Sequence, residues 1–423
     1  MSRLNALNYA CMNYLKRLQL IGLITVSFLS LKVIQAADVA VRYASVGAIA
    51  SELQDLAEKA LLEGGEPSHY AAIYNVGEYA LAARVHMIRS ARKSIDIQTF
   101  IWVDDVVTRY LFSELEAAAR RGVKVRLLVD HLVSFGKDVE PLAAMAVAHR
   151  NIEIRYFKPI SEFAINGLGV WASVALVDFS KLNRRMHNKL FVVDGRVAIV
   201  GGRNYQTVYY DWDEKFNFKD RDIIVCGRVS ENMRTSFDAY WEHDFSVPIA
   251  RFTDVQATLN SWELETPDLV SIRNFDADQF VNVSTLAGQY SLANHVNDGR
   301  IYEVGDVEYV CDPPNQLSKS KFRINPKSFH GEKVSKLMHG AETSVVVQSP
   351  YLISSRRTKG LVKDILKKNP DLDIHYSTNS LAAADHAVVA AVSLKQLRHQ
   401  FTRLKVNIYQ FKPDPQDLYS FAP

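Results

Sequence analysis

The chain has 423 residues, 48% of them hydrophobic and 23% charged, which excludes a disordered, collagen-like or coiled-coil protein and suggests two domains or two packed halves. Three cysteines are too few for a disulfide framework, and none lies at metal-ligand spacing. The formal net charge is +3, but residues 1–37 hold four basic residues and no acid, so the remainder carries −1 and lacks the basic excess of a nucleic-acid binder.

The first 37 residues have the pattern of a targeting or anchoring segment. Arg3, Lys16 and Arg17 precede an apolar run over residues 18–31, shorter than the ~20 residues of a typical membrane span. A cleaved signal peptide and a membrane anchor fit this pattern equally well, whereas a buried first helix would not explain the lack of acids. In both favoured cases, the positive charges place the rest of the chain outside the cytoplasm.

An internal repeat follows a lead-in, residues 38–80, that is expected to be helical. The matching segments, at offsets of 249 to 254 residues, are 94–100 with 344–349, 125–130 with 374–379, and 157–159 with 411–413. Each half has the order strand, helix, strand, helix, strand, which predicts an α/β fold with largely parallel sheet. The first half then covers residues 81–250 and the second 301–423, with a polar connector over 251–300.

The densest group of candidate functional residues begins at His187. Residues 186–193 have a strand pattern, and side chains alternate along a strand, so His187 and Lys189 are expected to point the same way. The imidazole can attack phosphorus as a nucleophile, and the ammonium can neutralise the non-bridging oxygens of a phosphodiester. This chemistry requires no metal and no other cofactor, and no carboxylate cluster in the sequence calls for one.

A hairpin is expected directly after this strand. Asp194-Gly195 is a strong turn signal, because both central residues of such a turn need positive φ, and the turn is the favoured role of Asp194. After the returning strand, Gly201 and Gly202 would let the backbone approach a bound phosphate, and Asn204 is placed to donate an amide N–H to it.

Two further acids are candidates to orient His187. Asp220 and Asp222 flank Arg221 just before a strand over residues 223–225. A carboxylate there could hold the imidazole ring, as outer-shell groups commonly do. A solvated entrance to the strand explains the same residues equally well.

Together, these residues resemble the signature of the phospholipase D superfamily, H-x-K-x4-D-x6-G-[GS]-x-N. The matching positions are His187, Lys189, Asp194, Gly201, Gly202 and Asn204. Residues 350–351, 378–383 and 409–413, and the F-x2-Y-W pattern ending at Trp241, are similar to the bacterial cardiolipin synthase branch, particularly its C-type members. The resemblance implies two tandem βα sandwich halves packed about a pseudo-twofold and a phosphohistidine intermediate.

That family pairs two such motifs, so that one His attacks phosphorus and the other protonates the leaving oxygen. The repeat offset projects the second His beyond Pro423, and the second half is therefore expected to be incomplete. The resemblance thus implies a further partner, a second fragment carrying the missing motif.

The favoured function is a phosphatidyltransferase at the bacterial inner membrane, with its body outside the cytoplasm, that makes cardiolipin from phosphatidylglycerol or another phospholipid. The expected partners are the phospholipid substrate and the membrane. The alternatives are a phospholipase or nuclease of the same superfamily and a catalytically impaired remnant. The −1 charge of the body disfavours nucleic acid.

Overall fold

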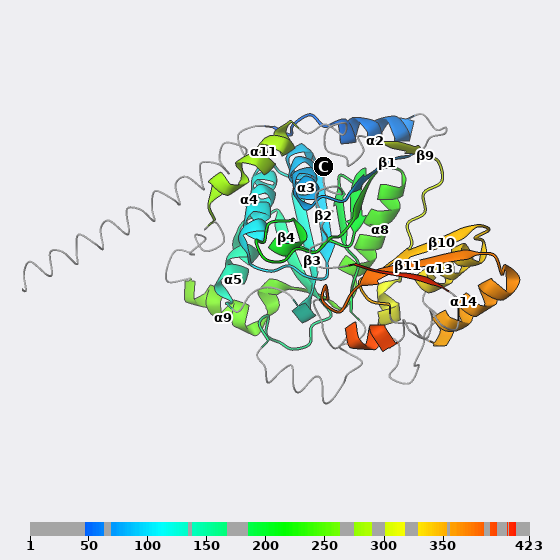
Figure 1. Cartoon of the computed structure of the whole chain (residues 1–423). Coiled ribbons are helices and arrows are strands. Elements are labelled where there is room, and N and C mark those ends of the chain that lie inside the picture. Colours follow the sequence, from blue (N-terminus) through cyan, green and yellow to red (C-terminus); the bar gives the residue numbers. More distant parts are fainter. Residues whose placement is uncertain are drawn as a thin grey trace, which may run out of the picture. The chain divides into compact units, whose positions relative to one another are not determined.

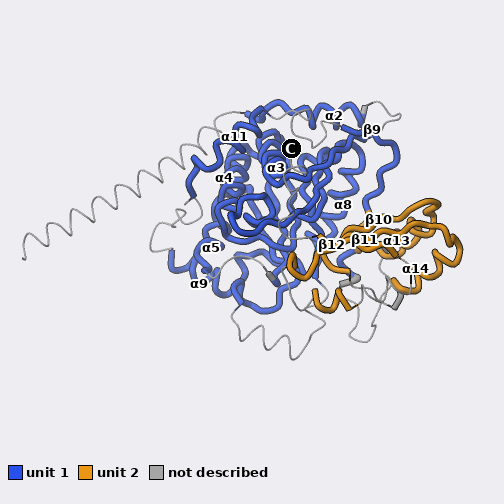
Figure 2. The backbone as a smooth tube through the Cα atoms, viewed as in Figure 1, with its two compact units in different colours: residues 1–309, 313–321 blue, residues 310–312, 322–423 orange. Residues whose placement is uncertain are grey.

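The computed structural model describes most of the chain, as two compact units (Figure 1). The described residues are 47–62, 69–133, 138–166, 185–262, 275–289, 301–317, 329–352, 356–384, 390–395, 404 and 406–411. Unit 1 takes those up to 309 and 313–317, and unit 2 takes 310–312 and those from 329 onward (Figure 2). The predicted signal or anchor, residues 1–37, lies outside them. Across the described ranges, no helix has both the length and the apolar character to cross a membrane.

Unit 1 is built on a mixed sheet, which has nine strands among the described residues, in the order β8-β4-β3-β2-β5-β6-β7-β1-β9. The strands are β1 His69–Tyr74, β2 Ser94–Thr99, β3 Lys124–Asp130, β4 Ile152–Phe157, β5 Leu190–Val193, β6 Val197–Gly201, β7 Asp222–Gly227, β8 Ser246–Pro248 and β9 Tyr302–Val304. Strands β2, β3 and β4 are parallel, and β2, β5, β6, β7, β1 and β9 alternate in direction.

Helices cover both faces of this sheet. They are α2 Glu52–Leu62, α3 Gly77–Ser90, α4 Val106–Arg120, α5 Glu140–Val147, α8 Val229–Trp241, α9 Thr253–Trp262 and α11 Val281–Gly288. Alternate residues of β5 join two different cores: Phe191 packs with α3 and α4, and Val192 packs with α8. A strand buried on both faces reads as an unbroken apolar run, as β5 does. The F-x2-Y-W pattern lies at the end of α8, and its Trp241 is buried.

Unit 2 repeats the parallel part of this design. Strands β10 Ser344–Gln348, β11 Asp373–Asn379 and β12 Asn407–Phe411 form a parallel sheet, packed against α13 Phe329–His339 and α14 Arg356–Lys368. Strands β2 and β10 begin 250 residues apart, and β3 and β11 begin 249 apart, as the sequence repeat predicts. The α/β fold class is confirmed.

Three boundaries differ from the prediction. Residues 69–74, inside the lead-in expected to be helical, form β1 and pair with β7 and β9. Because β9 extends the sheet of unit 1, the division between the units falls near residue 310 instead of residue 300. Strand β5 begins at Leu190, so His187 and Lys189 lie in the extended segment that precedes it.

Candidate active site

The strand order brings the candidate residues of unit 1 to one edge of the sheet. Gln98, at the end of β2, lies opposite Leu190, the first residue of β5, and Leu190 lies opposite Val200, near the end of β6. Gly201 in turn lies opposite Asp222, the first residue of β7. The segments that follow β2 and β6 therefore meet those that precede β5 and β7.

His187 and Lys189 converge on one aromatic ring. The imidazole of His187 stacks on Phe100, with ring centroids 3.9 Å apart and an interplanar angle of 21°. The ammonium of Lys189 lies 5.8 Å from the centroid of the same ring and donates a hydrogen bond of 3.0 Å to the backbone carbonyl of His187. The predicted pairing of an imidazole with an ammonium therefore exists, although not on a regular strand.

The two side chains have pKa values that suit different tasks. Desolvation by the surrounding protein, together with the positive charges of Lys189 and Arg185, lowers the pKa of His187 to about 4, although the residue is exposed. Partial burial lowers the pKa of Lys189 to about 8, against an opposing effect of Asp220. Near neutral pH, the imidazole of this candidate nucleophile is therefore uncharged, and the lysine still carries most of its charge.

A buried ion pair holds the segment that carries His187. The guanidinium of Arg185 contacts the Asp130 carboxylate through Nε at 2.8 Å and Nη2 at 2.7 Å. The same carboxylate accepts the backbone N–H of Met186 at 3.0 Å, and the Arg185 guanidinium also donates to the carbonyl of Lys158 at 2.8 Å. This contact fixes the chain one residue before the candidate nucleophile. The pairing of Asp130 with Arg185 was not predicted from the sequence, although Asp130 ends a predicted strand at the relevant sheet edge.

The glycine pair lies against two carboxylates. A Cβ atom at Gly201 would overlap the carboxylate of Asp222, and one at Gly202 would overlap the carboxylate of Asp220. The space that these glycines leave open is therefore filled by the two carboxylates. That the pair also lets the backbone approach a bound phosphate stays a prediction.

The two carboxylates have different surroundings. Asp222 is buried and forms ion pairs with Arg84 at 2.9 Å and Arg203 at 3.3 Å. Asp220 is half-buried, and its pKa is raised mainly by desolvation. The influence of Asp220 on the pKa of Lys189 connects it to the candidate site, whereas the contacts of Asp222 tie it to the two arginines.

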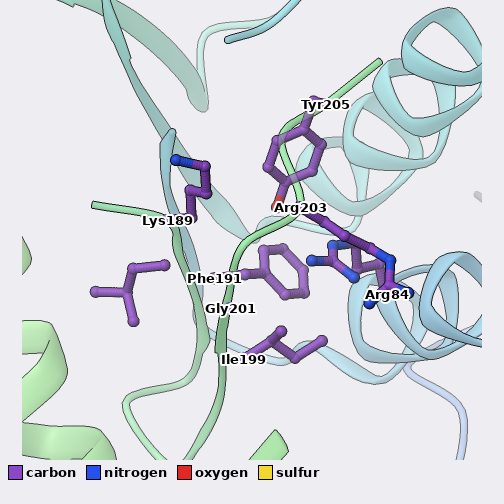
Figure 3. Close-up of a pocket in the computed structure, with 8 residues that line it drawn as sticks. Arg84, Lys189, Phe191, Ile199, Gly201, Arg203 and Tyr205 are labelled. Carbon is purple, nitrogen blue, oxygen red and sulfur yellow. The ribbon is translucent and has the colours of Figure 1, made fainter. Parts of the chain in front are cut away.

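A small pocket lies beneath Lys189 (Figure 3). Its lining includes Arg84, Phe191, Arg203 and Tyr205. Arg203 is buried and donates to the carbonyl oxygens of Tyr74 and Asn75 at 3.1 and 2.6 Å. The Lys189 ammonium points away from the two arginines.

Asn204 and Asp194 have structural contacts of their own. The Asn204 amide oxygen accepts the N–H of Ile101 at 3.1 Å, and its nitrogen donates to the Tyr209 hydroxyl at 2.9 Å. Its contacts thus hold the chain beyond β2, next to Phe100. The Asp194 carboxylate accepts three backbone N–H groups, those of residues 92–94, at 2.7 to 3.0 Å.

Asp194 lies at the far end of β5 from the candidate nucleophile. Five residue steps separate it from Lys189, which at ~3.3 Å per residue is about 16 Å. Asp194 and Gly195 both have positive φ, 55° and 68°, so the predicted turn is confirmed. Of the two roles considered for Asp194, turn structure and chemistry, the geometry favours the first.

Comparison with known proteins now identifies the family. A model of the cardiolipin synthase, phospholipase D-like domain matches residues 85–241. Cardiolipin synthase C of Escherichia coli K12 is 32% identical over 343 residues, which cover 79% of this chain and 67% of that protein. The chain belongs to the phospholipase D superfamily, in its bacterial cardiolipin synthase branch. It is thus a member of a family of phosphodiesterases and phosphatidyltransferases.

Two further comparisons give the extent of this likeness. An uncharacterized protein of Helicobacter pylori is 32% identical over 353 residues, which are 82% of this phospholipase D-like chain and 66% of that protein. The chain therefore spans about two thirds of the length of these curated relatives. The crystal structure of phosphatidylserine synthase from Haemophilus influenzae matches 90% of the chain and 78% of that structure, with a TM-score of 0.50 at 12% identity. It supports the phospholipase D-like fold alone.

Proposed function

We propose that the chain is a phosphatidyltransferase that makes cardiolipin from phosphatidylglycerol or another phospholipid. The observation that carries this proposal is the pair of His187 and Lys189 on the Phe100 ring, at one edge of the sheet of unit 1. The pair lies inside the segment that matches the cardiolipin synthase domain, and the Escherichia coli relative is named as a cardiolipin synthase.

The first step is attack by the neutral imidazole of His187 on the phosphorus of the donor lipid. A P–N bond forms, the bond from phosphorus to the head-group oxygen breaks, and that oxygen takes up a proton as the alcohol leaves. Lys189 neutralises the non-bridging oxygens as charge develops in the transition state. The pKa of about 4 for His187 keeps its lone pair available for this step.

The second step returns the enzyme to its starting state. A hydroxyl of a second phosphatidylglycerol attacks the phosphohistidine, a P–O bond forms, the P–N bond breaks and the hydroxyl proton is released to a base. The sequence contains one H-x-K pattern. We propose that the proton donor and base of these two steps come from a second motif of the same kind.

The site of action follows from the charge of residues 1–37. We propose that this segment, basic and free of acids before an apolar run, holds the enzyme at the bacterial inner membrane with the body outside the cytoplasm. A reporter that is active only in the periplasm, fused after Ala50, is expected to be active. A signal only from a cytoplasm-specific reporter would reverse this orientation.

Lipid analysis tests the proposed reaction. The protein, with and without a fragment carrying a second motif, is incubated with phosphatidylglycerol, and the products are separated by thin-layer chromatography. We expect cardiolipin, at a rate at least about 100-fold higher with the fragment, because a missing general acid costs about that much or more. Phosphatidic acid as the product would support a phospholipase, and equal rates would show that one motif suffices.

A further inference from the structure

The two units differ strongly in charge. Residues 310–312 and 322–423, which form unit 2, contain 15 Lys and Arg against 9 Asp and Glu, a net charge of +6. The rest of the chain beyond residue 37 contains 31 basic and 38 acidic residues, a net charge of −7. The net charge of −1 beyond residue 37 is therefore the sum of a basic unit 2 and an acidic unit 1.

The basic charge of unit 2 is concentrated on α14. This helix contains six Lys and Arg residues and one acid, Asp364. Val362 and Ile365 are buried against the sheet of unit 2, whereas Lys363, Lys367 and Lys368 are exposed. The helix thus has one apolar face that packs and one basic face that meets solvent.

Helix α13 adds exposed apolar side chains to unit 2. Val334 is 39% exposed and Leu337 is 76% exposed, and they lie three residues apart, on one side of the helix, next to the exposed Lys336. The ends of α13 and α14 meet, since Asn369 donates to the carbonyl of Glu342 at 2.9 Å. Unit 2 therefore exposes lysines of both helices and a leucine of α13.

We propose that this surface, formed by Val334, Lys336 and Leu337 of α13 and Lys363, Lys367 and Lys368 of α14, docks unit 2 on an anionic phospholipid bilayer. Lysines attract the anionic head groups, and an exposed leucine gains free energy when it enters the acyl boundary. A nucleic acid would satisfy the lysines but would leave Leu337 in water. The choice of lipid rests on the proposed function, whose substrate is itself an anionic phospholipid.

Hydrogen exchange on the full chain tests this docking, because it reports on each helix separately from residues 1–37. We expect peptides from α13 and α14 to exchange more slowly with vesicles of phosphatidylcholine containing 30% phosphatidylglycerol than with pure phosphatidylcholine vesicles. High salt should weaken this protection. Unchanged exchange in both helices, or protection by a single-stranded oligonucleotide and not by vesicles, would overturn the proposal.

Matched charge reversals make the test specific. Lys367→Glu with Lys368→Glu should remove the protection of α14, because each lysine near an anionic surface contributes about fivefold in affinity. Lys124→Glu with Arg228→Glu, at exposed positions of unit 1, makes the same change in charge and should leave the protection intact. Equal protection in both pairs would contradict the proposal.

Activity on two forms of substrate separates docking from catalysis. On monodisperse short-chain phosphatidylglycerol, the Lys367→Glu and Lys368→Glu variant should match the wild type, and on vesicles it should be slower. Turnover of the short-chain lipid, without protection of α13 and α14 by vesicles, would contradict the docking surface and support the proposed function. Protection of α13 and α14 without any turnover would support the docking surface and contradict the proposed function.

Discussion

At the scale of single residues, the different protonation states of His187 and Lys189 near neutral pH predict a bell-shaped pH profile. The pKa of His187 is about 4, so the neutral nucleophile accumulates as pH rises through that value. The pKa of Lys189 is about 8, so its charge is lost as pH rises further. We expect kcat/KM to rise through about pH 4 and to fall through about pH 8.

The variant Lys189→Arg isolates the alkaline side of this profile. Arginine keeps its charge throughout this range but fits a lysine site poorly, so kcat should fall while the decline above pH 8 disappears. The measurement is the pH dependence of lipid turnover for the variant beside the wild type. An unchanged alkaline decline in the variant would show that another group titrates there.

Phe100 is expected to position the nucleophile. Replacement by leucine removes the ring on which His187 stacks, and a misplaced nucleophile costs roughly 10- to 100-fold in kcat. Phe216→Leu, at a side chain that is 42% exposed, is the matched control and should retain activity. Equal kcat values for both variants, with equal melting temperatures, would remove Phe100 from the account.

Asp194→Ala should act on stability and not on chemistry. The change removes a charged acceptor from three backbone N–H groups and leaves alanine at a positive φ, which together cost about 2–4 kcal/mol. Denaturant unfolding measures this loss. A variant with full stability and no activity would instead give Asp194 a direct part in catalysis.

Local patterns made some residues of the site predictable and left others hidden. His187, Lys189 and the turn at Asp194 follow from spacing within one hairpin. The stacking of Phe100 and the buried pair of Asp130 with Arg185 join segments far apart in sequence, and only the strand order shows that they meet. The spacing pattern identified Gly201 and Gly202, but it could not show that the carboxylates of Asp220 and Asp222 lie against them.

At the scale of elements, the contact between the glycine pair and the segment that precedes β7 predicts a double-mutant effect. Gly202→Ala should destabilise the protein, because its Cβ would overlap the carboxylate of Asp220. Combining it with Asp220→Ala should restore part of the stability, measured as the free energy of unfolding. Gly288→Ala, where a Cβ meets nothing within 4 Å, is the control. Additive losses in the pair would contradict this contact.

The elements themselves were predictable where periodicity was strong. The parallel strands of both units recur at nearly the offset read from the sequence, because βα units repeat their apolar pattern. Strand β1 was missed, since its six residues carry too short a pattern to be told from a helical lead-in. The sequence placed the start of β5 at residue 186 instead of Leu190, because side chains alternate in direction along an extended segment as they do along a strand.

At the scale of the whole molecule, the distribution of charge matters more than its sum. A net charge of −1 beyond residue 37 suggested a neutral body, yet unit 2 is basic and unit 1 is acidic. Composition averaged over the chain could not show this, because the boundary near residue 310 is set by the pairing of β9 with β1. The proposed lipid docking and the proposed phosphoryl chemistry therefore fall in different units.

Detection of the covalent intermediate tests the central claim most directly. The protein, with the second-motif fragment, is incubated with phosphatidylglycerol and quenched at alkaline pH, where a P–N bond survives, and its peptides are analysed by mass spectrometry. We predict a phosphatidyl adduct on His187, absent from His187→Ala, which should also lack turnover. Turnover of the lipid by His187→Ala, or an adduct on another residue, would contradict the account.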